Sequence, residues 1–307
     1  MKNLLFITDP VDKLNLQTDT TLQIVQEAIN RGYNVFFALP QDISFCNCRV
    51  FAQTSKFKID LNNNISEYLG SEVRDLKEMD AIFIRQDPPF DMNYITVTYL
   101  LDLVKNNVKI INNPTEIRNS PEKFLPCHFP SLLPPTLITK DKKEIINFLN
   151  IHKEVVIKPL YLHGGREVFK LSEHDPNLHT ILEHFMNMSH QFIVQKYLHT
   201  VVETGDKRII LIDGEIVAGF KRMPQNGIRS NMVVGGIAEK HTLTARDIEI
   251  CQAIKAELKS RKLFLVGIDV IGDYLTEINV TSPTGFVPIK QLYGINAAQL
   301  LLARIFD

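Results

Sequence analysis

The stretch YLTEINVTSPT, residues 274–284, is the most informative part of this chain, because it places a carboxylate and an amide two residues apart on a strand-like segment. Side chains two residues apart on a β-strand point to the same side. We therefore expect Glu277 and Asn279 to share one face.

An apolar run just upstream, Leu265–Ile271, carries a single acid, Asp269. The Gly272-Asp273 pair between the two runs predicts a turn that joins them as a β-hairpin. For Asp269 to lie opposite Glu277 we expect an odd-numbered loop, most simply residues 272–274 with a bulge. A two-residue turn would place the two acids on opposite faces.

Such a hairpin brings together three oxygen-bearing side chains, Asp269, Glu277 and Asn279. Hard oxygen donors suit Mg²⁺, which keeps water and substrate phosphates in its remaining coordination positions. A solvent-exposed hairpin with ordinary polar residues is the alternative that this segment alone leaves open.

The chain has 307 residues, of which 45% are apolar and 22% charged, enough for one large core or two to three modest ones. A formal net charge of −1 and the absence of a long basic run give no reason to expect nucleic acid or a membrane as a partner. No segment has the length of a signal peptide's apolar run or of a membrane span, so we expect a cytoplasmic protein. Only Cys46 and Cys48 lie close together, and without a second pair we expect reduced thiols rather than a zinc site.

The first 120 residues show a repeated order of strand, helix and strand. An apolar strand pattern is followed by a helix capped by Asp19 and by a second strand, and this order recurs further along the chain. The strands are expected at 4–7, 35–39, 81–85 and 108–111, and the second helix around 94–104. This order predicts a parallel, doubly wound α/β domain. Between these elements, residues 47–66 are expected to form a polar excursion with short β-like pieces.

Prolines in residues 112–135 predict a linker, after which short strands dominate. Strands are expected at 155–157, 192–194, 208–212 and 215–220, and the Asp213-Gly214 pair predicts a primed turn between the last two. A helix over 245–260, opened by a capping box at Thr244, should pack beneath the Asp269 hairpin. This half of the chain is therefore expected to be α+β and antiparallel.

Cationic residues lie where strands end. Lys158 ends an apolar strand, Lys123 follows a helix start, and the Gly164-Gly165 pair can bring backbone N–H groups onto phosphate oxygens. Four arginines at strand ends or in loops suit carboxylate binding: Arg85, Arg208, Arg222 and Arg229. Taken singly, each of these cations is also compatible with solvated surface charge.

Read together, these residues resemble the bacterial glutathione synthetase family, which belongs to the ATP-grasp ligases. The similarity runs almost from end to end, and Gln195–Leu198 is similar to the adenine-binding hinge. Its strongest segments are RQDPPFD at 85–91, EKF at 122–124, IKPL at 157–160, GDKR at 205–208, VGID at 266–269 and residues 275–284.

The resemblance implies an ATP-grasp fold preceded by a parallel, Rossmann-like α/β domain. The domains would be residues 1–120, the N-terminal pre-ATP-grasp domain, and 121–307, the ATP-grasp domain. The latter would divide into a small ATP-binding subdomain at 121–195 and a metal and substrate subdomain at 196–307.

The same resemblance implies a role for each matched residue. ATP would be bound by Lys123, Lys158, Gly164, Gly165, Gln195, Lys196, Tyr197, Leu198 and Asp206. The metal ligands would be Asp269, Glu277 and Asn279, holding Mg²⁺ with Mn²⁺ as an alternative ion. Arg208, Arg222 and Arg229 would be catalytic, and Arg85, Asn231, Ser282, Pro283 and Thr284 would bind substrate.

The implied reaction joins γ-glutamylcysteine to glycine through an acyl phosphate, giving glutathione, ADP and phosphate. Clustered negative charge must be neutralised for this chemistry. Because an acyl phosphate hydrolyses in water, residues 224–236 are expected to form a mobile cover. The resemblance also implies a homo-oligomer, either a tetramer or a dimer.

The chain departs from the family pattern at several positions. Leu162 and Glu167 replace glycines of the phosphate loop, Gln86 replaces a lysine, Ser230 replaces a lid glycine, and Phe286–Pro288 replace a more polar segment. If Leu162 must adopt a positive φ, it carries strain of about 1 to 3 kcal/mol. These departures leave two alternatives open: a related ATP-grasp ligase with another substrate, and a nucleotide-binding homologue with impaired catalysis.

Overall fold

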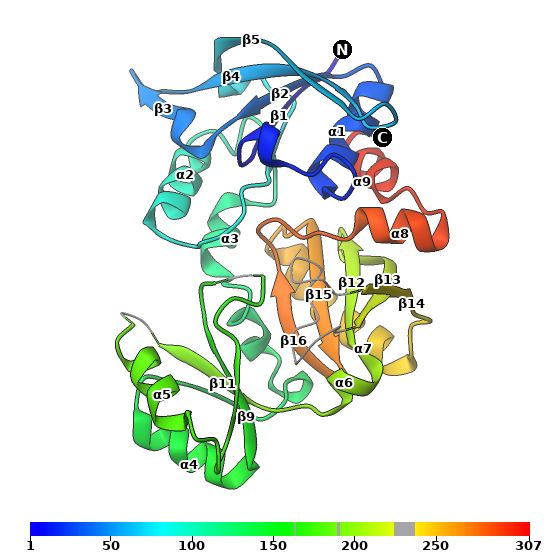
Figure 1. Cartoon of the computed structure of the whole chain (residues 1–307). Helices are drawn as coiled ribbons and strands as arrows, with labels where there is room; N and C mark the ends of the chain where they lie inside the picture. Colours follow the sequence, from blue (N-terminus) through cyan, green and yellow to red (C-terminus); the bar gives the residue numbers. More distant parts are fainter. Residues whose placement is uncertain (163, 189–190, 224–236) are drawn as a thin grey trace.

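The computed structural model describes residues 1–162, 164–188, 191–223 and 237–307, and the strands of this part form three sheets (Figure 1). The first sheet takes its strands from the first third of the chain: β1 (Asn3–Ile7), β2 (Asn34–Ala38), β3 (Ile43–Cys46), β4 (Arg49–Asp60), β5 (Ile65–Asp75), β6 (Ala81–Ile84) and β7 (Lys109–Ile111). The helices of this region are α1 (Thr20–Asn30), α2 (Met92–Asp102) and α3 (Pro114–Asn119).

Four neighbouring strands of this sheet, in the order β2-β1-β6-β7, are parallel. Alternate residues of β1 face opposite sides: Phe6 lies in the core cluster of α1, and Ile7 in that of α2. Each helix begins at an aspartate, because Asp19 accepts from the backbone N–H of Leu22 and Asp91 from those of Asn93 and Tyr94. The predicted doubly wound α/β domain is confirmed.

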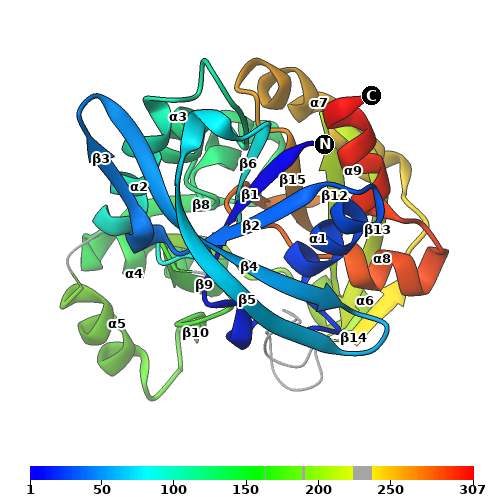
Figure 2. The same ribbon diagram turned by 90° about the horizontal axis from the view of Figure 1, so that it is seen from above.

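The prediction of short β-like pieces in residues 47–66 is wrong. β4 and β5 are 12 and 11 residues long and pair along almost their whole length, as a ribbon that runs across the middle of the view in Figure 2. Most of β5 is exposed on both sides, so it lacks the alternation of apolar and polar residues that marks a half-buried strand. β5 is held by backbone hydrogen bonds to β4, and its residue pattern does not predict this pairing.

The second sheet is antiparallel, with the order β10-β9-β11-β8. Its strands are β8 (Thr136–Thr139), β9 (Glu154–Pro159), β10 (Phe169–Ser172) and β11 (Phe192–Lys196). Helices α4 (Lys142–His152) and α5 (Leu178–Met186) cover one of its faces, where Phe185 and Phe192 meet edge to face at 5.0 Å between ring centroids.

The third sheet is also antiparallel, with the order β14-β13-β12-β15-β16. Its strands are β12 (Asp206–Ile212), β13 (Glu215–Met223), β14 (Ile237–Lys240), β15 (Leu265–Ile271) and β16 (Tyr274–Asn279), with helices α6 (Thr200–Thr204) and α7 (Ala245–Ser260). Asp213 and Gly214 have φ values of 51° and 71°, which confirms the primed turn. The capping box at Thr244 and Asp247 is present, and α7 packs beneath the hairpin through Ile250 and Ile254.

The β15–β16 hairpin pairs Asp269 with Glu277, as predicted, but not through the predicted loop. Ile271 pairs with Tyr274, so the connection is the two-residue turn Gly272-Asp273. The extra residue lies within the strand, where the register shifts between Asp269 and Val270. The bulge beside Asp269 therefore brings Asp269 opposite Glu277, which an odd-numbered loop was expected to achieve.

The last two helices, α8 (Phe286–Tyr293) and α9 (Ala297–Phe306), return to the first sheet. They share a core with α1, and the two chain ends lie near each other at the top of Figure 1. The predicted domain boundary at residue 120 did not include this packing of the C-terminal helices against α1. The division of the chain into three parts stays a prediction. None of the helices in the described ranges has the length and apolar character needed to cross a membrane.

Asn112 joins the first and third sheets. Its side-chain amide donates to the carbonyl oxygens of Leu265 and Val280, both at 2.8 Å, and its Oδ1 accepts from the N–H groups of Phe264 and Leu265 at 2.6 and 2.8 Å. The residue is 3% exposed, so water cannot replace these four bonds.

Asn112→Ala should therefore lower the free energy of unfolding by about 2 to 4 kcal/mol, because it leaves several buried backbone groups unpaired. Urea denaturation of the variant measures this change, and Asn107→Ala at an exposed position is the matched control. A loss equal to that of the control would contradict the role of Asn112 as the joint between the sheets.

Candidate functional site

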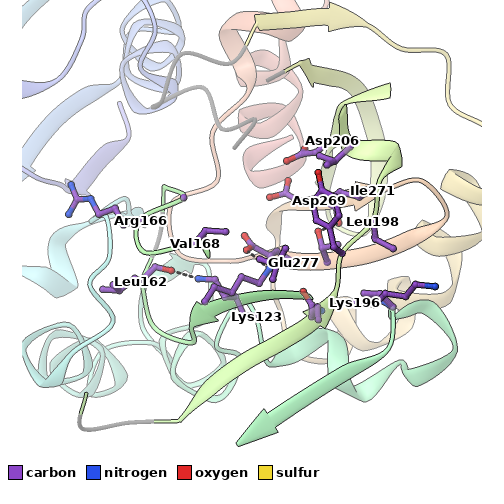
Figure 3. Close-up of a pocket in the computed structure, with 18 of the residues that line it drawn as sticks. Lys123, Leu162, Arg166, Val168, Lys196, Leu198, Asp206, Asp269, Ile271 and Glu277 are labelled. Carbon is purple, nitrogen blue, oxygen red and sulfur yellow. Dashed lines mark hydrogen bonds and ion pairs between the residues drawn. The ribbon is translucent and has the colours of Figure 1, made fainter. Parts of the chain in front are cut away.

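A pocket of about 120 Å³ lies between the second and third sheets (Figure 3). Strands β9 and β11 form one wall, and the β15–β16 hairpin forms the other. All nine residues expected to bind ATP line this pocket: Lys123, Lys158, Gly164, Gly165, Gln195, Lys196, Tyr197, Leu198 and Asp206. The structure thus brings together residues that are up to 83 positions apart, although their individual roles stay predictions.

Two lysines and one acid meet inside the pocket. The Lys158 ammonium lies 3.3 Å from Oε1 of Glu277, and the Lys123 ammonium donates to the carbonyl oxygen of Leu162. Burial alone would raise the pKa of Glu277, but Lys158 and Lys123 outweigh it and lower that pKa. Burial lowers the pKa of Lys123, and repulsion from Lys158 adds to the effect. A strongly anionic ligand would relieve this repulsion.

Asp269 is held by polar contacts to both of its carboxylate oxygens. Oδ1 accepts from Arg208 at 2.5 Å and lies 3.0 Å from Nη2 of Arg222, while Oδ2 accepts from Arg208 at 2.9 Å and from the amide of Asn279 at 3.2 Å. Burial would raise the pKa of Asp269, but the two guanidinium groups lower it to about 2. The carboxylate is therefore ionised at neutral pH.

Arg222 joins this acid to a second one. Its guanidinium donates to both oxygens of Asp206, with bonds of 2.6 to 2.9 Å. Burial would lower the pKa of Arg222, but Asp206 and Asp269 raise it. Arg208 and Arg222 thus lie together beside the pocket, paired with acids rather than free at the surface.

The expected metal ligands can serve as a site for a hard cation. Asp269 and Glu277 are ionised, and the amide oxygen of Asn279 accepts no hydrogen bond from the described residues. The described part of the chain has no cluster of three or more His, Cys, Asp or Glu residues suited to a metal. Two carboxylates and an amide fit an ion that completes its shell with water and phosphate oxygens.

Four of the residues expected to bind substrate, Arg85, Ser282, Pro283 and Thr284, lie at the seam between the first and third sheets. Arg85 donates to Thr21 Oγ1 at 3.0 Å and to the carbonyl oxygen of Pro283 at 3.1 Å, and Ser282 donates to the carbonyl oxygen of Arg85. Arg208 donates to the carbonyl oxygen of Thr284 at 3.3 Å. Arg85 is 4% exposed and bound to protein groups, so its observed contacts hold the seam together, and its role toward substrate stays a prediction.

Several predicted features fall outside the described residues. Arg229, Asn231 and Ser230 belong to residues 224–236, as does the expected cover, and the structure describes none of them.

The backbone conformation of the phosphate loop differs at the two positions where this chain lacks a family glycine, Leu162 and Glu167. Leu162 does not adopt a positive φ, so the strain considered for it is absent. Glu167 does, at 52°, next to Gly164 and Gly165 at 66° and 72°. Its carboxylate lies 3.7 Å from Nε2 of His184 on α5. The position favours glycine for its backbone, as the family pattern implies.

Phe286–Pro288 do not line the pocket. They open α8, and Phe286 is 2% exposed in the core shared with Phe220 and α1. The apolar character of Phe286, at the start of this segment, therefore serves packing between the sheets.

Sequence reasoning missed the apolar walls of the pocket. Val156, Val201 and Ile271 line it, and Thr276 both lines it and donates to the carbonyl oxygen of Asp269. An apolar strand residue looks the same in a sequence whether it faces a core or a ligand, so no local signal marks these positions.

Replacing Glu167 by glycine should raise the free energy of unfolding by about 0.5 to 1 kcal/mol, since relief of the left-handed strain exceeds the entropic cost of glycine. Urea denaturation measures the difference. The neighbouring Arg166→Gly, at a residue without positive φ, should destabilise instead. Destabilisation by both changes would show that Glu167 is not strained.

Two family models match the chain, and together they cover most of it. The model of the prokaryotic glutathione synthetase N-terminal domain matches residues 2–118, and that of the ATP-grasp domain of the same enzymes matches residues 122–294.

Curated proteins are similar over nearly the whole length. The glutathione synthetase of Brucella melitensis is 47% identical over 95% of this chain and 94% of its own. That of Agrobacterium fabrum is 43% identical over 98% of this chain and 95% of its own.

Solved structures show the same fold at low identity. A D-cycloserine synthetase superimposes with a TM-score of 0.70 at 12% identity, over 98% of this chain and 99% of its own. The D-alanine–D-alanine ligase of Bacillus anthracis, solved with ATP, superimposes with a TM-score of 0.64 at 15% identity, over 99% and 96%. With both family models and these relatives matching across its length, the chain belongs to the prokaryotic glutathione synthetase family and has an ATP-grasp fold.

Proposed function

We propose that this ATP-dependent ligase forms glutathione by joining γ-glutamylcysteine to glycine through an acyl phosphate, with release of ADP and phosphate. Membership of the family supports the reaction. The observation that carries the proposal within the molecule is the meeting of Lys123 and Lys158 with the acids of the β15–β16 hairpin in one pocket.

The chemistry requires two anions to meet. The carboxylate of γ-glutamylcysteine attacks the γ-phosphorus of ATP, and both reactants carry negative charge. Lys123 and Lys158 line the pocket where the phosphates would lie, and Arg208 and Arg222 lie beside Asp269. Preorganised cations of this kind stabilise the charge that develops during transfer. The amine of glycine then attacks the acyl carbon, and phosphate leaves.

The proposed metal ligands are Asp269, Glu277 and Asn279, with Mg²⁺ as the ion and Mn²⁺ as the alternative. A bound Mg²⁺ would neutralise phosphate charge. In the structure the hydrogen bond from Asn279 to Asp269 and the pairing of Asp269 with Glu277 hold these side chains in one group.

Membership of the family favours glutathione formation over the two alternatives. A ligase with another substrate was suggested by Phe286–Pro288, of which Phe286 is packed in the core. Impaired catalysis was suggested by Leu162 and Glu167, of which Leu162 is unstrained. A cover formed by residues 224–236, association into a dimer or tetramer, and a cytoplasmic location stay predictions; light scattering would test the association.

The test is ADP release from ATP and Mg²⁺ with γ-glutamylcysteine, with and without glycine, combined with mass detection of the product. We expect glycine-dependent ADP and glutathione in equal amounts. Lys158→Ala should raise KM for ATP by about 10- to 100-fold, since it removes a buried cation from the pocket, whereas Lys143→Ala on the exposed side of α4 should not. ADP release without glutathione would contradict the proposed acceptor or donor.

A further inference from the structure

Lys207 is a buried cation that has no role in the description above. It lies on β12, one residue before Arg208, and is 7% exposed. Successive side chains of a strand point to opposite faces of its sheet. Arg208 reaches Asp269 beside the nucleotide pocket, whereas Lys207 reaches Asp247 on α7. Lys207 is not among the described residues that line the pocket, so any effect it has on the site is indirect.

The Lys207 ammonium bonds to the turn of the β15–β16 hairpin. Its Nζ donates to the carbonyl oxygen of Gly272 at 2.7 Å. Gly272 is the first residue of the two-residue turn that joins the two strands. Strand β12 therefore holds this hairpin at two points, because Arg208 bonds to the Asp269 carboxylate and Lys207 bonds to the turn.

The same turn packs closely against α6. Gly272 has a φ of 57°, and a Cβ at this residue would lie 3.0 Å from Oγ1 of Thr200. A side chain at Gly272 would therefore displace either the turn or Thr200. Contact with α6 and the bond to Lys207 together fix the position of the turn.

Asp247 fixes the direction of the Lys207 side chain. It is fully buried at the start of α7, and its Oδ1 accepts from Lys207 at 2.5 Å. Its Oδ2 accepts from the N–H of Thr244 at 2.9 Å and lies 2.8 Å from Nε2 of His241. Burial would raise the pKa of Asp247, but the bonds from Lys207 and His241 lower it. The carboxylate is thus ionised at neutral pH and holds the ammonium.

A buried ion pair is a poor source of stability, because the cost of removing both charges from water offsets their attraction. An apolar pair could fill the same space. A hydrogen bond to the Gly272 carbonyl requires a donor, which a lysine held by Asp247 supplies in a fixed direction. The contacts of Lys207 therefore favour a role in placing the hairpin over a role in stabilising the fold.

We propose that Lys207 is a positioning residue for the metal ligands, which keeps Asp269 and Glu277 opposite each other by holding the turn at Gly272. The inference rests on the proposed function, in which these two acids bind Mg²⁺. They lie on the two strands that the turn joins, so a displaced turn would change their spacing. Removal of groups that orient metal ligands without touching the ion commonly lowers metal affinity by about 10- to 100-fold.

The double variant Lys207→Met/Asp247→Asn tests this role. It removes the donor without leaving a buried unpaired charge, and asparagine keeps an acceptor for the N–H of Thr244. ADP binding is measured by calorimetry over a range of Mg²⁺ concentrations, so the readout does not depend on turnover. We expect the Mg²⁺ concentration for half-maximal enhancement of ADP affinity to rise about tenfold, and ADP affinity without Mg²⁺ to change by less than about twofold.

Lys259→Met/Asp213→Asn is the matched control, because it makes the same two changes in an exposed ion pair between α7 and the β12–β13 turn. It should leave both quantities unchanged. Asp247→Asn alone keeps the amine of Lys207 as a donor to Gly272, and should raise the Mg²⁺ requirement by less than about threefold.

An unchanged Mg²⁺ requirement in the double variant would overturn the positioning role. Equal losses of ADP affinity with and without Mg²⁺ would also overturn it, since a purely structural role of Lys207 predicts that result. A wild-type protein whose ADP affinity does not respond to Mg²⁺ would overturn the proposed metal site, and the positioning role with it.

Discussion

The register of the third sheet is the constraint on which the rest of the site depends. Pairing places Arg222 opposite Asp206, Arg208 opposite Asp269, and Asp269 opposite Glu277 across four neighbouring strands. A slip of one residue in any pair would turn these side chains to the other face. Because Asp269 is 3% exposed, its charge depends on the two arginines, and a buried carboxylate without them would be costly.

The site is completed by parts of the chain far from this sheet. Lys158 reaches Glu277 from β9 of the second sheet, and Glu122 holds the chain just after Asn279 through its three hydrogen bonds. Asn112 fixes the same region to the first sheet. The pocket therefore lies between two sheets, and bonds from all three sheets set the position of its acids.

Much of this arrangement could be predicted from residues with local signals. Asp19 and Thr244 predict the starts of α1 and α7, and the Asp213-Gly214 pair predicts the turn between β12 and β13. The two-residue spacing of Glu277 and Asn279 predicts that they share a face. The position of the bulge could not be predicted, because a loop residue and a strand residue restore the register equally well.

Contacts between segments far apart in the sequence also could not be predicted from local residue patterns. Strand β5 lacks alternation, and an apolar residue such as Phe286 looks the same in the sequence whether it faces a ligand or α1. Arg85 illustrates the same limit: an arginine before a proline-rich loop suggests carboxylate binding, yet its guanidinium bonds to Thr21 and to the chain at Pro283.

The most direct measurement is calorimetric ATP binding as Mg²⁺ is varied, in the wild-type protein and in Glu277→Gln, with Glu249→Gln on exposed α7 as control. If the hairpin acids hold the metal, Mg²⁺ should raise the ATP affinity of wild type and control by about tenfold or more, and that of Glu277→Gln by less than about twofold. An equal response to Mg²⁺ in all three proteins would contradict the assignment of the hairpin as the metal site.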